Sequence, residues 1–467
     1  MKKCATTLAL PLSLIYSSSL ESSQVPTSWK HAVVIPIPKK GSSSSPENYR
    51  PISLTDPFAR IFERILCDTI KNDCLHKFSR FQQGFLAQRS CTTSLVHSIS
   101  TYKSILFEHN SLDVIFFDFR KAFDKVHHQL LIQKLVNFDI PNSFISWFSD
   151  FLTGRTFSVK INDHLGTPSS IIPSGVPQGT VSGPLLFIIF INDLLLELEK
   201  IPRLHVAAFA DDIKLYSYDP LAIQTGIDTV VTWSASNSLP LAESKTALLR
   251  LGSHNSSHPF TIVGSTINES LSVRDLGLIT DPSLKFAPHI NKTTALALLR
   301  SKQLLKSFKS NSPSFYTYLF KCYVLPIIEY CSVIYSPPPS SSLSLKLESP
   351  LRFFSRIVCQ RCNIQYSSYS DRLTTLNMFS IRHRRLKAQL ILLYKFLDGT
   401  AFFPNLDAHV KFSSSARRPM NLIHLRPNTS DFFSSIIPIW NAITCHVNHF
   451  LLPSQFYSLI NSNVSRF

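Results

Sequence analysis

The sequence predicts a mixed α and β fold, in which short strands carry acidic residues and amphipathic helices supply the core. The first observation is residues 207–216, where two apolar runs that suit strands flank an Asp-Asp pair. The second is residues 112–117, a β-prone run followed directly by Asp118 and then by helical sequence. The third is residues 58–73, whose apolar side chains recur at helical spacing and are expected in the core: Phe58, Ile61, Phe62, Ile65, Leu66 and Ile70.

The acidic pair Asp211-Asp212 falls where a tight turn between two strands is expected. Two carboxylates this close repel each other, and a divalent cation relieves the repulsion. Mg²⁺ takes one or two carboxylates together with substrate phosphates. An isolated Asp-Asp turn at a surface needs no such explanation. Here a third carboxylate, Asp118, ends a strand, which is a usual place for a functional group in sheets flanked by helices.

A Gly- and Pro-rich loop lies between the two acidic sites. Residues 173–185 contain three of the chain's twelve glycines, a composition that lets a backbone approach a ligand closely. The apolar run at residues 184–196 then predicts a buried helix behind the loop. After Asp118, Asp124 is expected to cap a helix that continues to Val136.

Charge and composition narrow the partner and the compartment. The 467 residues hold 47 Lys and Arg against 30 Asp and Glu, a net charge of +17. Such an excess suits a polyanion, with nucleic acid first and an anionic membrane surface second. The basic helical sequence at residues 293–310 and the basic run at 382–387 fit the first choice. Nine scattered cysteines indicate a reducing compartment, and the absence of an 18-residue apolar run predicts no transmembrane helix.

Three blocks, in this order, resemble the palm of reverse transcriptases from non-LTR (LINE-like) retrotransposons. FFDFRKAFDKV at residues 116–126 resembles their motif A, SGVPQGTVSGPLLFIIFINDL at 174–194 their motif B, and FADD at 209–212 their motif C. The resemblance implies an α+β right-hand polymerase fold with fingers, palm and thumb. In that fold an antiparallel palm sheet carries the catalytic Asp residues and helices lie behind it.

The resemblance also implies the site and its chemistry, which is RNA-directed DNA synthesis by two-metal nucleotidyl transfer onto a primer 3′-hydroxyl. Asp118 and Asp211, assisted by Asp212, are the implied catalytic and metal-binding residues, with two Mg²⁺ ions or Mn²⁺ in their place. Arg50 would meet the template or the incoming triphosphate, Phe123 would lie under the incoming sugar, and Lys245 of motif D would protonate the leaving group. The motif B residues Gln178 and Gly179 complete the implied substrate site.

The same resemblance suggests a division of the chain and its partners. Residues 1–30 would form an N-terminal helical extension rather than a signal peptide, 31–290 the fingers and palm, 291–399 a helical thumb and connection, and 400–467 a C-terminal region. The implied partners are an RNA template, a DNA primer and dNTPs, with no membrane. The implied location is intracellular, in the cytoplasm, the nucleus or both.

Two other interpretations remain open at this point. The chain could be a catalytically inactive, transposon-derived remnant that still binds nucleic acid, although all three carboxylates and the Gln178-Gly179 pair are present. It could also be a group II intron maturase, whose motifs differ around motif A.

Overall fold

The structure is a computed structural model that describes residues 2–39, 44–167, 174–252, 257–415, 417–426 and 429–463, so Pro173 lies outside the described residues. The chain divides into two compact units. The first comprises Met1–Ala87, Ile115–Thr246 and His258–Asn268, and the second comprises Gln88–Val114, Ala247–Ser257 and Glu269–Phe467. The predicted divisions at residues 30, 290 and 399 stay predictions.

One sheet of the first unit has the strand order β2-β1-β4-β5. Strand β1 (His31–Pro38) pairs antiparallel with β2 (Tyr49–Leu54) and parallel with β4 (Thr156–Ile161). The two-residue strand β5 (His164–Leu165) pairs with the end of β4. Arg50 lies on β2 opposite Ile37.

The expected strand-turn-strand at residues 207–216 is a hairpin of β6 (His205–Phe209) and β7 (Asp212–Ser217). Phe209 pairs with Asp212, so only Ala210 and Asp211 form the turn. The second predicted strand is β3 (Ser111–Phe117), which lies beside β7 in its sheet. This order brings the strand that leads into Asp118 next to the hairpin whose turn holds Asp211.

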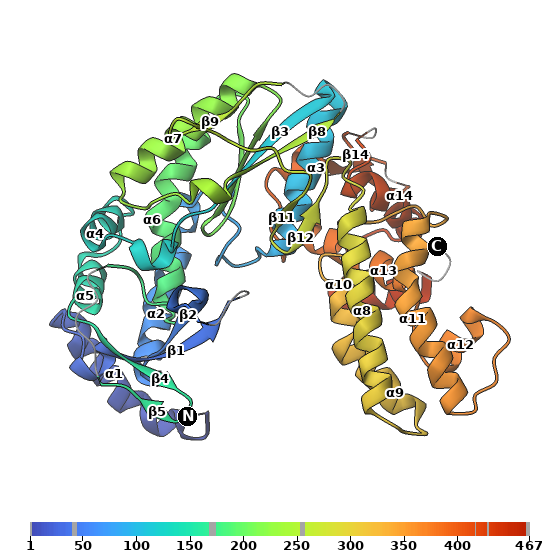
Figure 1. Ribbon diagram of the computed structural model, residues 1–467, viewed down its shortest axis with the longest axis horizontal. Coiled ribbons are helices and arrows are strands. Elements are labelled where there is room, and N and C mark those ends of the chain that lie inside the picture. The colour runs from blue at the N-terminus through green and yellow to red at the C-terminus, as the bar shows by residue number, and fades with distance from the viewer. Residues whose placement is uncertain are drawn as a thin grey trace. The chain divides into compact units, whose positions relative to one another are not determined.

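Helix α6 (Ser182–Leu198) forms the centre of the first unit's core, because it is apolar on every side and almost entirely buried. It contacts α2 (Pro57–Cys74), α4 (His128–Asn137) and α7 (Pro220–Ser236), as Figure 1 shows. The helices predicted at residues 58–73 and 184–196 are thereby confirmed. Helices α1 (Ala5–Glu21) and α5 (Asn142–Leu152) and strands β9 (Thr261–Ile262) and β10 (Ser265–Thr266) complete the unit.

The prediction that Ile65 of α2 belongs to the core is wrong. Ile65 is 49% exposed, whereas the next residue, Leu66, is buried. At about 100° per residue, Ile65 lies on the far side of the helix from Glu63 and Ile70, which mark the middle of the buried face. The buried face instead includes a charged side chain, Glu63.

The second unit is mainly helical. Its helices are α3 (Cys91–His109), α8 (Ala287–Ser307), α9 (Pro313–Tyr323), α10 (Leu325–Glu329), α11 (Ser342–Arg361), α12 (Tyr369–Thr375), α13 (Ile381–Leu397), α14 (Phe432–Thr444) and α15 (Pro453–Asn463). Its strands are β8 (Ala247–Gly252) and two hairpins, β11 (Val273–Asp275) with β12 (Leu278–Thr280) and β13 (Val410–Phe412) with β14 (Leu422–His424). No helix within the described ranges combines the length and apolar character needed to cross a bilayer.

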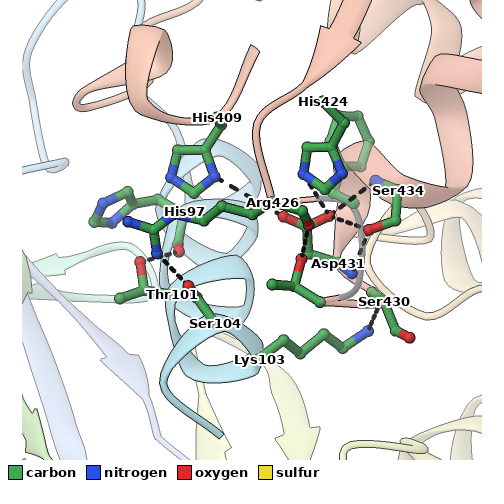
Figure 2. Close-up of polar contacts among 12 residues, drawn as sticks. His97, Thr101, Lys103, Ser104, His409, His424, Arg426, Ser430, Asp431 and Ser434 are labelled. Carbon is green, nitrogen blue, oxygen red and sulfur yellow. Dashed lines mark hydrogen bonds and ion pairs between the residues drawn. The ribbon is translucent and has the colours of Figure 1, made fainter. Parts of the chain in front are cut away.

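A buried carboxylate organises the C-terminal part of the second unit. Figure 2 shows the imidazoles of His409 and His424 turned toward Asp431, the N-cap of α14. The nearest nitrogen–oxygen distances are 3.9 Å to His409 and 3.4 Å to His424, which are ion-pair distances rather than well-formed hydrogen bonds. Burial alone would raise the pKa of the Asp431 carboxyl. The two imidazoles and the N–H and hydroxyl of Ser434 outweigh it and hold the pKa well below its usual range.

Replacing Asp431 by Asn is expected to destabilise the protein by about 1–3 kcal/mol at pH 7, since the cap oxygen is kept but the buried charge facing two imidazoles is lost. Because the folded-state pKa is lowered, the stabilisation is fully present above the unfolded value of about 3.9 and is lost as pH falls through the folded value. Thermal melts of both proteins from pH 7 to pH 3 should therefore show a difference that is constant down to about pH 4 and begins to narrow toward pH 3. Asp407→Asn, an exposed site nearby, is the control and should melt like the wild type throughout. A constant difference down to pH 3 would contradict this account.

Candidate active site

The turn that carries Asp211 is held in a strained backbone conformation. Ala210 has φ of +58°, a left-handed value that costs a non-glycine residue about 1–2 kcal/mol. The side chain of Gln82 stabilises it, because Gln82 Oε1 accepts hydrogen bonds from Ala210 N at 2.9 Å and from Gly84 N at 2.8 Å. A Cβ at Gly84 would lie 2.6 Å from Ala210 N, so this position needs glycine. The site is thus shaped by a loop that precedes α3 in the chain.

Asp118 lies close enough to Asp211 for its charge to act on the Asp211 carboxyl. Burial raises the pKa of the Asp211 carboxyl, and the neighbouring charge of Asp118 raises it further. The Asp211 backbone N–H and the guanidinium of Arg50 act in the opposite direction, but the pKa remains raised overall. The backbone of Asp118 is held in place, because its carbonyl accepts a hydrogen bond from Ala242 N at 2.7 Å. Two like charges are therefore held together with one cation from strand β2 nearby.

This arrangement fits a hard divalent cation. Mg²⁺ needs only one or two protein carboxylates when substrate phosphates supply further oxygens, and Asp118 and Asp211 provide two. Asp212 is exposed at the start of β7, and its assisting role stays a prediction. Among the residues that the structure describes, no group of three or more His, Cys, Asp or Glu side chains is placed to hold a metal ion.

Lys245, the residue of motif D that was predicted to belong to the site, lies beside Asp118. Its Nζ is 2.9 Å from Oδ2 of Asp118, and the Lys245 side chain is 69% exposed. An ion pair this open contributes at most about 1 kcal/mol to stability. The lysine is therefore free to leave Asp118 for another anion without a large cost. Its catalytic role stays a prediction.

The motif B loop packs against strand β2 through its backbone. Ser53 N donates a hydrogen bond to the carbonyl of Gln178 at 2.7 Å. Gly179 has φ of +104°, and a Cβ there would lie 2.6 Å from the carbonyl oxygen of Ser53, so both conformation and space require glycine. Gln178 and Gly179 are thus placed on the strand that carries Arg50.

The predicted capping role of Asp124 is wrong. Asp124 lies in the short 3₁₀ helix Ala122–Lys125, and α4 begins later with His127 as its N-cap. Asp124 Oδ1 instead accepts a hydrogen bond from Nε2 of Gln178 at 2.9 Å. The helix was expected to start one turn too early because the intervening residues have no strong breaker. Asp124 therefore orients a motif B side chain.

Phe123 belongs to motif A and contacts residues of motif B. Its ring stacks on Phe187 of α6 with centroids 4.4 Å apart and an interplanar angle of 16°. Phe85 contacts the ring edge-on at 6.2 Å. The carbonyl of Phe123 accepts a hydrogen bond from Val176 N at 2.8 Å, which connects motif A to the motif B loop. The ring is half-buried, with a rigid aromatic support behind it.

The sequence profile described as "Reverse transcriptase (RNA-dependent DNA polymerase)" matches residues 37–278, more than half of the chain. The chain therefore belongs to the reverse transcriptase family. The match confirms the predicted resemblance and, with it, the right-hand polymerase fold class. The roles of the individual site residues stay predictions.

Named relatives point in the same direction. The probable RNA-directed DNA polymerase from transposon BS of Drosophila melanogaster is 30% identical over 331 residues, covering 64% of this chain and 35% of that protein. The RNA-directed DNA polymerase from the mobile element jockey of the same fly is 30% identical over 297 residues, covering 60% and 32%. The chain thus spans about a third of the length of these two relatives. Among solved structures, apo telomerase from Candida tropicalis aligns with a TM-score of 0.43 and 12% identity, covering 86% of this chain and 73% of that one.

Proposed function

We propose that this chain is an RNA-directed DNA polymerase that adds nucleotides from dNTPs to a DNA primer annealed to an RNA template. The observation that carries the proposal is the pair Asp118 and Asp211, held together at the strand ends of a chain that belongs to the reverse transcriptase family. The relatives that are named as RNA-directed DNA polymerases of mobile elements support it.

The metal we propose is Mg²⁺, as two ions held by Asp118 and Asp211 with help from Asp212, and Mn²⁺ as a substitute. When bound, such ions supply Lewis-acid stabilisation of the attacking and leaving oxygens. The chain's residues then have separate tasks. Arg50 presents a planar guanidinium to phosphate oxygens beside Asp211. Phe123 supplies a floor for the sugar, and the Gln178-Gly179 loop supplies the adjoining wall.

Exposed cations in the second unit support the proposal of a polyanionic partner. Arg300, Lys302 and Lys306 of α8 are exposed cations on one predicted basic helix. The other basic run contributes less, because Arg384 is paired with Glu329 and Arg385 is buried. We therefore assign phosphate-backbone contact to α8 rather than to α13.

The proposal is tested by extending a DNA primer on an RNA template of mixed sequence and then sequencing the product. The expected product is complementary to the RNA, and its length depends on all four dNTPs. Addition of nucleotides without regard to the template, or no extension under any divalent metal, would contradict the proposal. A primer without template is the control for untemplated addition.

Lys245 gives a separate prediction. Lys245→Ala is expected to slow single-nucleotide incorporation about 100-fold, since a positioned general acid contributes roughly 10²–10⁴-fold. Lys245→Arg keeps the ion pair with Asp118 but cannot release a proton at neutral pH, so it should be nearly as slow. Pre-steady-state incorporation rates distinguish the cases. Full activity of the Arg variant would show that Lys245 acts through its charge alone.

A further inference from the structure

Glu63 is a carboxylate on the buried face of α2, and its side chain is fully shielded from solvent. Its Oε2 accepts hydrogen bonds from the backbone N–H of Ser182 at 2.8 Å and from the Ser182 hydroxyl at 2.5 Å. The backbone N–H of Val181 also stabilises the ionised form. All these donors belong to the beginning of α6, so the Glu63 carboxylate accepts hydrogen bonds from the N-terminal end of that helix.

These contacts provide a cap that α6 lacks. Its N-cap residue is Val181, whose side chain accepts no hydrogen bond, and its first turn contains no acidic residue. The first N–H groups of a helix have no partner within the helix and carry partial positive charge. A buried N-terminus therefore requires an acceptor from elsewhere, and Glu63 supplies one from α2.

The charge of Glu63 has a buried counterpart in Arg155, at the residue before β4. Burial raises the pKa of the Glu63 carboxyl, while the Ser182 donors and the charge of Arg155 oppose this. Arg155 is fixed in turn, because its Nη1 donates to the carbonyl of Phe151 at 3.1 Å. The carboxylate is thus hydrogen-bonded to the start of α6 through Oε2, while the fixed cation of Arg155 acts on it through charge without a direct bond, since Oε1 of Glu63 has no hydrogen-bond partner among the described residues.

The loop that leads into α6 is anchored twice to one continuous segment. Its first anchor is Ser53 of β2, which contacts Gln178 and Gly179 through the backbone. Its second anchor is Glu63 of α2, and only Thr55 and Asp56 separate that helix from β2. Between the anchors, the Thr180 hydroxyl donates to the Pro177 carbonyl at 2.8 Å. The position of the loop therefore depends on both contacts.

We propose that Glu63 is a positioning residue of the nucleotide site, which accepts hydrogen bonds from the first turn of α6 and so fixes the Gln178-Gly179 loop against the strand that carries Arg50. The effect on nucleotide binding rests on the proposed polymerase function. The placement of the loop does not, so the two parts are measured separately.

Loop placement is measured by hydrogen exchange of the amides in residues 174–190 of the full chain. Glu63→Met, which keeps the side-chain volume but removes the acceptor, should speed exchange at the start of α6 by about tenfold or more. Glu63→Gln keeps one acceptor oxygen and should restore most of the protection. Glu199→Met is the matched control, because Glu199 is the C-cap of α6 and contacts Ser79 rather than the loop. It should leave exchange at residues 178–183 unchanged.

Nucleotide binding is measured by steady-state incorporation with the same variants. Glu63→Met should raise the KM for dNTP roughly tenfold with a smaller change in kcat, which is the pattern of lost binding rather than lost chemistry. Glu63→Gln should recover most of the affinity, and Glu199→Met should show the wild-type KM. A general loss of folding would instead lower the active fraction in both Met variants and leave KM alone.

Unchanged exchange at residues 178–183 in Glu63→Met would overturn the proposal. So would a Gln variant as impaired as the Met variant, because acceptance of a hydrogen bond would then not be the cause. An inactive wild type whose loop still loosens in Glu63→Met would refute the polymerase function and the nucleotide effect but keep the loop placement. Loosening without any change in KM would overturn the part that concerns nucleotide binding.

Discussion

Replacing Asp211 by Asn is expected to reduce primer extension by roughly 10³-fold or more. The substitution keeps the shape of the side chain and removes one of the two charges, Asp118 and Asp211, that would hold the metal ions. Metal-ion stabilisation of a transition state is worth several kcal/mol, which corresponds to this loss in rate. Single-turnover incorporation on a primer–template duplex measures it. Asp163→Asn, at an exposed turn between β4 and β5, is the control and should retain wild-type rates.

The same variant is expected to be more stable than the wild type when no divalent metal is present. The pKa of Asp211 is raised in the folded state by burial and by Asp118. A carboxyl whose pKa is raised on folding lowers the free energy of unfolding as it ionises. The decrease occurs as pH rises from the unfolded-state pKa of about 3.9 through the folded-state pKa. Asn carries no charge, so its melting temperature at pH 7 in EDTA should exceed that of the wild type, and the gap should close toward pH 3. A variant that is both inactive and unstable would show that Asp211 serves the fold.

Phe123→Val is expected to weaken discrimination against ribonucleotides by about 10- to 200-fold in kcat/KM, the range that one steric contact in a pocket supplies. The ring is backed by Phe187 and cannot retreat, so a 2′-hydroxyl pressed against it would overlap. Valine removes the outer part of the ring and leaves room for the hydroxyl. Competition between rGTP and dGTP on one template measures the ratio.

Stability alone cannot distinguish a sugar-contacting role of Phe123 from an ordinary core role, because both predict some loss on truncation. Phe190→Val provides the comparison, since Phe190 is a fully buried ring of α6 that packs on Trp233. It should lower the melting temperature while the choice of sugar stays as in the wild type. If Phe123→Val shows the same pattern, the residue is core and the discrimination lies elsewhere.

The local features of the active site could be predicted because their signals are contiguous in the sequence. A strand that leads into Asp118, a two-strand pattern around Asp211 and a Gly-rich loop at Gly179 each lie within about a dozen residues. Their order then indicated a known family, and the family match confirmed it. The helices at residues 58–73 and 184–196 were equally accessible, because their apolar periodicity is strong.

The side chains that hold these features in place could not be predicted in the same way. Gln82 contacts Ala210 over 128 positions of sequence, and Glu63 contacts Ser182 over 119. Periodicity does carry a trace of Glu63, which lies on the stripe of Ala59, Phe62 and Leu66 where a charge is out of place. Naming its partner required the tertiary structure. The cluster at Asp431 is similar, since its histidines come from separate parts of a hairpin that gives little strand signal.

We propose that Asp118 and Asp211 form a divalent-metal-dependent site for RNA-templated nucleotide addition. The most direct measurement is single-turnover addition of dTTP to oligo(dT) on poly(rA), with Mg²⁺ or with EDTA, by the wild type and by the Asp118→Ala/Asp211→Ala double variant. We expect rapid addition only by the wild type with Mg²⁺. Addition that persists in EDTA, or in the double variant, would contradict it.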